Sequence, residues 1–256
     1  MPDHLILDWP TERICILRLN RPEAYNALNR KLTEELRSAV ADLPSSDARV
    51  MILTAEGKGF CAGADLKERK LMSDDEKYAH NRALNALADG IAALPICTVV
   101  ALNGTAMGGG VEMSLACDIR FAAAGIGLGL TEARIGAIPG AGGTQRLPRL
   151  IGTARALEMM YSGEPISSEQ AERWGLVNAT VPADRLMDHT MAFAEVVARR
   201  SRRTARHLKT AVYTGLERDL AAGLEIERQA IVEVLASDDY KEGLAAFAER
   251  REPEFG

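Results

Sequence analysis

The sequence is poor in cysteine, and its cysteines are widely spaced. The 256 residues contain four of them: Cys15, Cys61, Cys97 and Cys117. This spacing excludes a CxxC metal pair and a dense disulfide framework. We therefore expect a protein of a reducing compartment, which for this chain predicts the cytoplasm.

Long apolar runs and a strong charge of one sign are also missing. The longest apolar stretch, residues 91–102, is interrupted by Pro95, and the N-terminus carries Asp3 and Asp8 where a signal peptide needs an apolar core. Neither a membrane span nor a targeting segment is expected. With 31 Lys and Arg against 36 Asp and Glu, the net charge of −5 gives the whole chain no attraction for nucleic acids or anionic membranes.

Several catalytic signatures are absent. There is no GxxxxGK[ST] loop, and Met113 stands where a GxGxxG fingerprint starting at Gly108 needs its last glycine. No HExxH or GxSxG motif occurs, and the four histidines are far apart in the sequence. Binding of nucleotide phosphates by a glycine-rich loop, metal catalysis and Ser-His hydrolysis are therefore not predicted. Neither a metal nor a separate cofactor is expected.

What the sequence does contain is an alternation of strands and helices. Apolar runs bounded by Pro, Asn or Gly predict buried strands over residues 14–20, 49–55, 96–103 and 119–123. Leu32, Leu36 and Val40 repeat at helical spacing between the first two, and Ser73 with Glu76 forms a capping box before a second helix. The alternation predicts an α/β fold.

The C-terminal third has a different character. From about Thr153 the sequence is mostly compatible with helix, with one weak strand at residues 177–181. No linker rich in Pro, Gly or Ser separates this part from the rest. The helical tail is therefore expected to belong to the same folding unit or to pack against other subunits.

Two glycine-rich turns, within residues 51–69 and 99–118, each connect a predicted strand to a helix start. A helix start presents backbone N–H groups without intrahelical partners. Asp65 and Glu112 place a carboxylate beside each turn, which repels a full anion. A carbonyl oxygen that becomes negative only during reaction suits such a site better, and each N–H donor is worth roughly 3 kcal/mol of barrier. The alternative for the glycines at 108–110 is a tight turn or close helix packing.

Glu112 and Glu132 are candidates for acid-base work. Glu112 lies among apolar or small neighbours, where burial raises a carboxyl pKa; the alternative is a capping or ion-paired residue. Glu132 lies in the glycine-rich stretch 127–147, taken as a loop, and the alternative is a solvated carboxylate or a partner for Arg134. Together the two glutamates would straddle one water molecule.

A basic run between Arg199 and Lys209 allows three interpretations. It could bind nucleic acid or the phosphates of a cofactor. It could instead be a solvated helix face or a subunit contact.

Three segments carry a family resemblance: CAGADLKER (61–69), AMGGGVEMSLACDIRFAA (106–123) and LTEARIGAIPGAGGTQRLPRLIG (130–152). They resemble the enoyl-CoA hydratase/isomerase, or crotonase, family, and the likeness extends over residues 21–255. The resemblance implies a spiral of ββα turns with the active site in residues 1–200. A C-terminal helical region, residues 201–256, would build a homotrimer or hexamer and cover the active site.

The resemblance also implies a coenzyme A thioester as substrate. Ala64 and Gly109 match the two backbone N–H donors of the family's oxyanion hole. Glu112 and Glu132 match the two glutamates of its hydratases, which favours addition of water to a 2-enoyl-CoA. Further positions match residues that line the CoA pocket: Ala24, Ala62, Ala64, Asp65, Leu66, Lys67 and Gly109.

Within the family the sequence looks most similar to methylglutaconyl-CoA hydratases and their bacterial relatives. A hydratase for a branched or dicarboxylic acyl group, or an isomerase, is therefore the alternative. One such relative binds RNA through a lysine-rich helix, but the matching segment 30–43 here mixes Arg30, Lys31 and Arg37 with acidic residues. Nucleic acid is therefore not expected as a partner.

Overall fold

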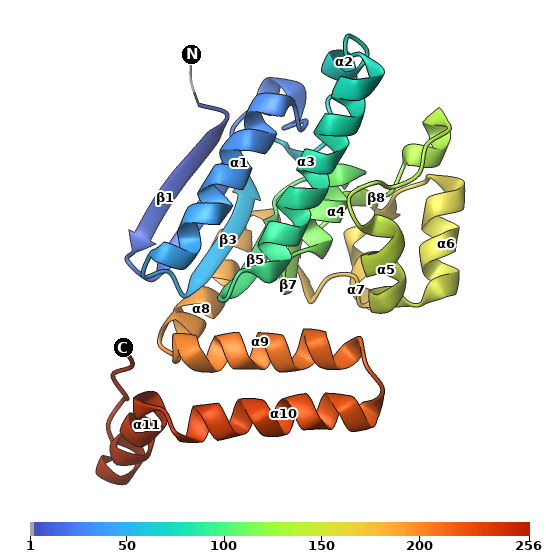
Figure 1. The fold of residues 1–256 in the computed structure, drawn as a ribbon. Helices are drawn as coiled ribbons and strands as arrows, with labels where there is room; N and C mark the ends of the chain where they lie inside the picture. The colour runs from blue at the N-terminus through green and yellow to red at the C-terminus, as the bar shows by residue number, and fades with distance from the viewer. Residues whose placement is uncertain (1–2) are drawn as a thin grey trace.

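The computed structural model describes residues 3–256 and contains two β-sheets (Figure 1). The larger has six strands in the order β1-β2-β3-β5-β7-β10. These strands are β1 (Leu5–Thr11), β2 (Ile14–Leu19), β3 (Val50–Ala55), β5 (Cys97–Leu102), β7 (Ile119–Ala123) and β10 (Ala179–Val181). β1 runs antiparallel to β2 and the other neighbours are parallel. The sequence-based strands correspond to β2, β3, β5, β7 and β10, whereas β1 was not predicted.

The smaller sheet has four short strands in the order β4-β6-β8-β9. They are β4 (Gly59–Cys61), β6 (Thr105–Met107), β8 (Gly127–Gly129) and β9 (Ile166–Ser167). Each turn of the chain adds one strand to each sheet, as β3 then β4, β5 then β6, and β7 then β8, and helical segments follow. This repeating ββα path is the predicted α/β crotonase spiral, and the fold class is confirmed.

The four inner strands of the larger sheet, β2, β3, β5 and β7, are buried on both faces because alternate side chains enter two different cores. Helices α1 (Arg30–Asp42) and α3 (Asp74–Ala93) cover one face, and α8 (Leu186–Ala198) covers the other. The predicted capping box starts α3, with Glu76 N donating to Ser73 Oγ at 3.3 Å and Ser73 N donating to Glu76 Oε2 at 2.8 Å.

The glycine-rich stretch 127–147 is more ordered than the predicted loop. It contains β8, a 3-10 helix at Glu132–Ile135, and the start of α5 (Gly143–Ile151). The shorter helices around it are α2 (Leu66–Arg69), α4 (Gly109–Leu115), α6 (Thr153–Ser162) and α7 (Ser168–Trp174).

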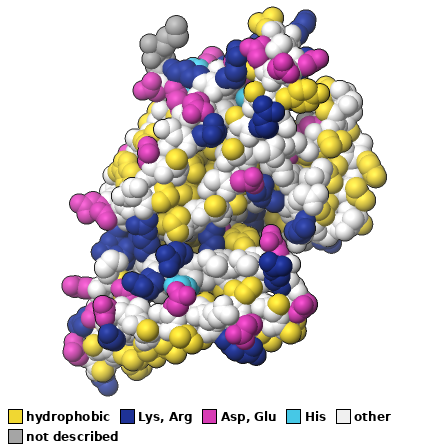
Figure 2. Space-filling model, in the orientation of Figure 1, with side chains coloured by type: hydrophobic (Ala, Val, Ile, Leu, Met, Phe, Trp, Pro, Cys, Tyr) yellow, Lys and Arg dark blue, Asp and Glu magenta, His cyan; other side chains and the backbone are white. Residues whose placement is uncertain are grey.

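The last three helices are α9 (Arg202–Leu216), α10 (Leu220–Leu235) and α11 (Asp238–Glu249). α9 and α10 lie side by side beyond the sheets (Figure 1), and neither has a buried residue. Large apolar side chains are exposed along them, and Figure 2 shows apolar atoms along the rim formed by α10 and α11. The exposed large apolar side chains of α9, α10 and α11 include Leu208, Val212, Leu216, Leu220, Ile231, Val232, Leu235, Leu244 and Phe247. No helix in residues 3–256 is both long enough and apolar enough to span a bilayer.

Candidate active site

The two glycine-rich turns meet at one cavity of about 590 Å³. Its walls come from the ends of β4 and β6, from α3 and α4, and from the segment around Glu132. The lining residues are Ala62, Gly63, Ala64, Leu66, Arg69, Asn81, Leu84, Met107, Gly108, Gly109, Glu112, Thr131, Glu132, Arg134, Ile135, Ala137, Ile138, Gly140, Ala141 and Pro165. All lie between Ala62 and Pro165, so residues 201–256, predicted to cover the site, contribute none of them within one chain.

The first turn follows β4 and presents the amide of Ala64. Leu28 braces this turn, because its N–H donates to Gly63 O at 2.8 Å and its carbonyl accepts from Asp65 N at 3.1 Å. Ala64 lies between these two bonds, and its own N–H donates to no acceptor within residues 3–256. The turn therefore holds one unused donor at the cavity wall.

The second turn joins β6 to α4 and presents the amide of Gly109. Gly109 is the first residue of α4, so its N–H has no intrahelical acceptor. The two turns touch: a Cβ built on Gly110 would lie 2.6 Å from Cys61 O, and one built on Gly63 would lie 3.3 Å from Gly109 N. A side chain at Gly63 or Gly110 would prevent the two turns from lying this close together. The glycines therefore allow close packing of the turns and also keep the two N–H donors near each other.

Glu112 lies one helical turn beyond Gly109 and is 3% exposed. Its Oε1 accepts from Ala141 N at 2.7 Å and from Gly143 N at 2.8 Å. Burial raises its pKa above the ordinary value, and the backbone donors oppose that shift without cancelling it. The carboxylate belongs to no ion pair within the described chain, but its bond from Gly143 N satisfies the first N–H of α5, so the capping alternative holds for its Oε1.

Glu132 begins the 3-10 helix on the other side of Gly108. Its Oε2 is buried without a hydrogen-bond partner in residues 3–256, and a Cβ built on Gly108 would lie 2.8 Å from its Oε1. Burial and the nearby charge of Glu112 raise its pKa. Arg134 pairs with Glu164 instead, so Glu132 faces the cavity unpaired.

Comparison with known proteins agrees with the spiral and with the motifs at the cavity. The sequence pattern of the enoyl-CoA hydratase/isomerase family matches residues 10–256. The chain belongs to this family. Its relatives in the family are enzymes, and the resemblance inferred from the motifs is confirmed.

Similar proteins match at least 97% of the chain. The crystal structure of enoyl-CoA hydratase from Bacillus anthracis has a TM-score of 0.96 and 41% identity, covering 98% of both chains. Pseudomonas aeruginosa DspI has a TM-score of 0.94 and 32% identity, covering 100% of this chain and 97% of its own. Enoyl-CoA hydratase domain-containing protein 2, mitochondrial, from Homo sapiens is 40% identical over 255 residues, covering 97% of this chain and 87% of the relative.

Of the site residues predicted for this family member, six line the cavity and three do not. Ala62, Ala64, Leu66, Gly109, Glu112 and Glu132 line it. Ala24 is half-buried in a 3-10 helix outside the lining, and Lys67 is exposed. Asp65 caps α2, accepting from Lys67 N and Glu68 N at 3.1 Å, and pairs with Arg21 at 3.1 Å. Its carboxylate therefore stabilises the turn and is not directed at the cavity, contrary to the expectation that it repels anions there.

The basic residues singled out in the sequence lie elsewhere. Arg202 donates to the carbonyls of Ser46 and Pro44, and Lys209 pairs with Asp118 at 3.1 Å, so both tie α9 to the spiral. None of the basic run lines the active-site cavity.

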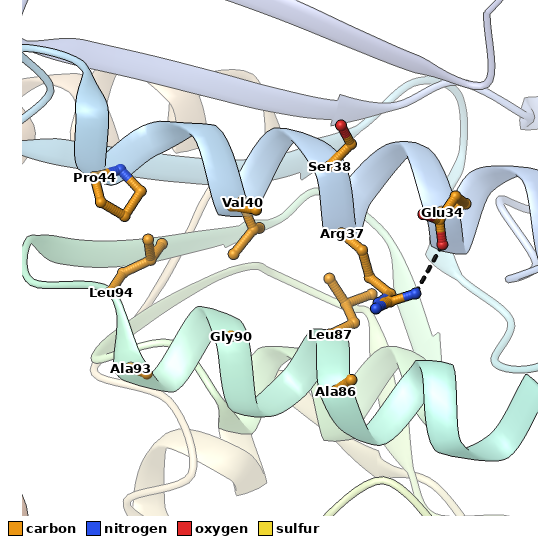
Figure 3. A pocket seen from close by; sticks show the side chains of 11 residues that line it. Glu34, Arg37, Ser38, Val40, Pro44, Ala86, Leu87, Gly90, Ala93 and Leu94 are labelled. Atoms are coloured by element: carbon orange, nitrogen blue, oxygen red, sulfur yellow. Dashed lines mark hydrogen bonds and ion pairs between the residues drawn. The ribbon is translucent and has the colours of Figure 1, made fainter.

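Helix α1, the segment compared with the RNA-binding relative, carries balanced charge. In the groove between α1 and α3, Arg37 pairs with Glu34 at 2.8 Å (Figure 3). Lys31 pairs with Glu35 at 3.4 Å, and Arg30 pairs with Glu76 at 3.0 Å. Each cation of this helix is thus matched by a carboxylate.

Sequence reasoning missed several lining residues. Arg69, Met107, Ile135, Ile138 and Pro165 line the cavity but were not among the predicted site residues, although all except Pro165 lie within the three segments that carry the family resemblance. Asn81 and Leu84 of α3 line it as well and were likewise not predicted. Helical spacing was the available signal for Arg69, since it lies three residues beyond Leu66. Within residues 3–256, no three His, Cys, Asp or Glu side chains are grouped so that they could hold a metal ion.

Proposed function

We propose that the protein is an enoyl-CoA hydratase that adds water reversibly and syn to a trans-2-enoyl-CoA, giving a 3-hydroxyacyl-CoA. The observation that carries the proposal is the pairing of two unused backbone donors with two carboxylates of raised pKa around one cavity. The reaction so described uses water and the acyl-CoA and calls for no separate cofactor.

In this proposal the thioester oxygen accepts hydrogen bonds from the N–H groups of Ala64 and Gly109. Glu112 removes a proton from water, and the oxygen attacks C3 of the enoyl group. The electron pair of the C2–C3 double bond shifts toward the thioester, and the two N–H donors stabilise the enolate oxygen. Glu132 then delivers a proton to C2, so that one water molecule has been added. The raised pKa values suit one carboxyl that starts ionised and one that starts protonated.

The test of this proposal is product identification. Purified protein with crotonyl-CoA in heavy-oxygen water is expected to give 3-hydroxybutyryl-CoA that carries the label at C3, as measured by mass spectrometry. The competing family activity is isomerisation of a 3-enoyl-CoA to a 2-enoyl-CoA, which incorporates no water oxygen. Isomerisation without any labelled hydroxy product would contradict the hydratase proposal.

The assembly proposed with this function is a homotrimer or a pair of trimers. Its support is the exposed apolar side chains of α9, α10 and α11, because a monomer seldom leaves so many large apolar groups in water. Light scattering is expected to give a mass three or six times the 27.7 kDa of one chain. A mass of one chain at micromolar concentration would contradict this assembly.

A further inference from the structure

Helix α3 carries three polar side chains to which the proposed chemistry assigns no task. They are Asn81, Asn85 and Asp89, which we call the polar stripe. The spacing of four residues places them on one face of the helix, beside the core-facing side chains of Leu84 and Ala88. Polar groups next to a core need hydrogen-bond partners, and those of the stripe lie in the loop before α5 and in α5 itself.

The two asparagines of the stripe hold one carbonyl group of that loop. Residues 137–142 form neither helix nor strand, so contacts from outside the loop set the direction of its backbone groups. Gly140 O accepts from Asn85 Nδ2 at 2.5 Å and from Asn81 Nδ2 at 3.3 Å. A Cβ built on Gly140 would lie 2.7 Å from Asn81 Nδ2, so glycine leaves room for this approach. The carbonyl of Gly140 is therefore fixed by α3.

The third member of the stripe acts on the next carbonyl through an arginine. Asp89 pairs with Arg146 of α5 at 2.7 Å, and Arg146 donates to Ala141 O at 3.2 Å. The carbonyls of Gly140 and Ala141 are thus both restrained from α3. The N–H of Ala141 lies between these two carbonyls in the chain, so its direction is restrained as well.

That N–H is one of the donors to the proposed catalytic base. The carbonyl of Gly140 and the N–H of Ala141 belong to one planar peptide group and point in opposite directions. The N–H end donates to Glu112 Oε1 at 2.7 Å. A donor that fixes the carbonyl end therefore also directs the N–H toward Glu112, and it polarises the peptide so that the N–H becomes a stronger donor.

The charges around Glu112 do not include the asparagines. Burial raises the pKa of Glu112, and its backbone donors and the charge of Arg146 oppose that shift. Glu132 is the charged group on the other side of the cavity, and its pKa is raised by burial and by Glu112. From α3 comes Asp89, whose charge is paired with Arg146. Replacing Asn85 by another neutral residue therefore changes hydrogen bonds without changing any charge.

We propose that Asn85 is a positioning residue, which fixes the Gly140–Ala141 peptide so that its N–H keeps the ionised Glu112 carboxylate directed at the attacking water. The inference rests on the proposed hydratase function, in which Glu112 is the base. Asn85 lies outside the cavity lining, so it acts through this peptide and not on the substrate.

The first test is the pH profile of Asn85→Leu, which keeps a branched side chain but removes the donor. Without that bond the Ala141 N–H stabilises the ionised form of Glu112 less, so the pKa of Glu112 rises further. The acidic limb of kcat/KM for crotonyl-CoA is expected to move up by about one pH unit, since a hydrogen bond to a charged group corresponds to roughly one unit or more. The plateau of kcat is expected to fall about 3- to 10-fold because the base is less well oriented, with little change in KM.

Three further variants accompany it. Asn85→Gln keeps the amide on a longer side chain and is expected to recover part of the shift. Arg82→Gln, an exposed change on the same helix, is expected to leave the profile unchanged. If leucine is not accommodated in the fold, Asn85→Ala removes the same donor and takes its place.

The second test needs no catalysis. Glu112→Gln is introduced into the wild-type protein and into Asn85→Leu, and the thermal unfolding of all four proteins is compared at neutral pH. Because Asn85 supports the ionised carboxylate, its loss makes that charge costlier to bury. Glu112→Gln is therefore expected to raise the Tm by about 2–4 °C more in Asn85→Leu than in the wild-type protein.

An acidic limb that does not move in Asn85→Leu would overturn the proposal, and so would additive changes in Tm. A shift of equal size in Arg82→Gln would assign the effect to α3 as a whole and would overturn it too. If the wild-type protein hydrates no crotonyl-CoA, the hydratase function fails and the Tm comparison alone decides. Non-additive changes would then uphold the link between Asn85 and Glu112, and additive changes would overturn that link as well.

Discussion

Gly109→Pro is expected to lower kcat for hydration of crotonyl-CoA by about 100- to 1,000-fold, the usual effect of removing one oxyanion donor. Gly109 is the first residue of α4, the position where proline is best tolerated because the N–H has no intrahelical acceptor there. The substitution removes the proposed donor and leaves the hydrogen bonds of the helix in place. Stopped-flow or steady-state kinetics with crotonyl-CoA measures the effect, and circular dichroism checks the fold.

The matched control for this variant is Gly109→Ala, which adds a methyl group but keeps the N–H. Its Cβ would lie 3.3 Å from Leu28 Cδ1, the flexible end of a side chain. A much smaller loss than for proline is expected. If alanine and proline impair catalysis equally, the shape of the turn matters and the amide does not. If neither reduces kcat, the oxyanion assignment is wrong.

Glu112→Gln and Glu132→Gln are each expected to lower kcat by about 100-fold or more, since general acid-base groups contribute that much. Glutamine keeps the size of the side chain but can neither take up nor release a proton at neutral pH. The double variant should lose less than the product of the two single losses, because both groups act in the same transition state. Glu158→Gln, an exposed change on α6, should have no effect. Activity within a few-fold of wild type in either single variant would contradict the assignment.

Stability separates a catalytic loss from a folding defect in Glu112→Gln. Burial raises the pKa of Glu112 in the folded protein, so folding favours the protonated form. The stabilisation by that proton is complete below the ordinary value of 4.5 and is lost as the pH rises through the folded-state pKa. Thermal unfolding should therefore show the variant to be more stable than wild type near neutral pH, with the difference shrinking as the pH falls toward 4.5. A less stable variant at neutral pH would show that the hydrogen bonds to Ala141 and Gly143 outweigh burial.

The long strands and helices were predictable because each carries its own pattern. Mostly apolar runs such as residues 119–123 become strands buried on both faces, and β7 has the predicted limits. The capping box at Ser73 starts α3 in the same way. In contrast, β4, β6 and β8 have three residues each, too few for a periodic signal, and their pairing depends on the spiral path. β1 was missed because its residues after Leu5 are exposed and mixed in polarity.

At the site, sequence reasoning identified the groups with distinctive chemistry. Glu112 was marked by its apolar neighbours, and Ala64 and Gly109 by their turns and by the family motifs; their catalytic roles stay predictions. The same reasoning could not separate Lys67 from Arg69, since both are basic residues within one short segment. The orientation of α2 directs Arg69 toward the cavity and leaves Lys67 exposed.

The amino-acid sequence by itself determined the class of fold, the family and the residue types that the chemistry needs, because hydrophobic periodicity, glycine turns and motifs are local properties of the chain. Tertiary structure alone decided which of these residues share a cavity. The contact of the two glycine turns and the bonds from Ala141 and Gly143 to Glu112 depend on segments far apart in the chain. Burial and neighbouring charge arise only when those segments pack together, and they set the pKa values and the unused donors on which the proposed reaction depends.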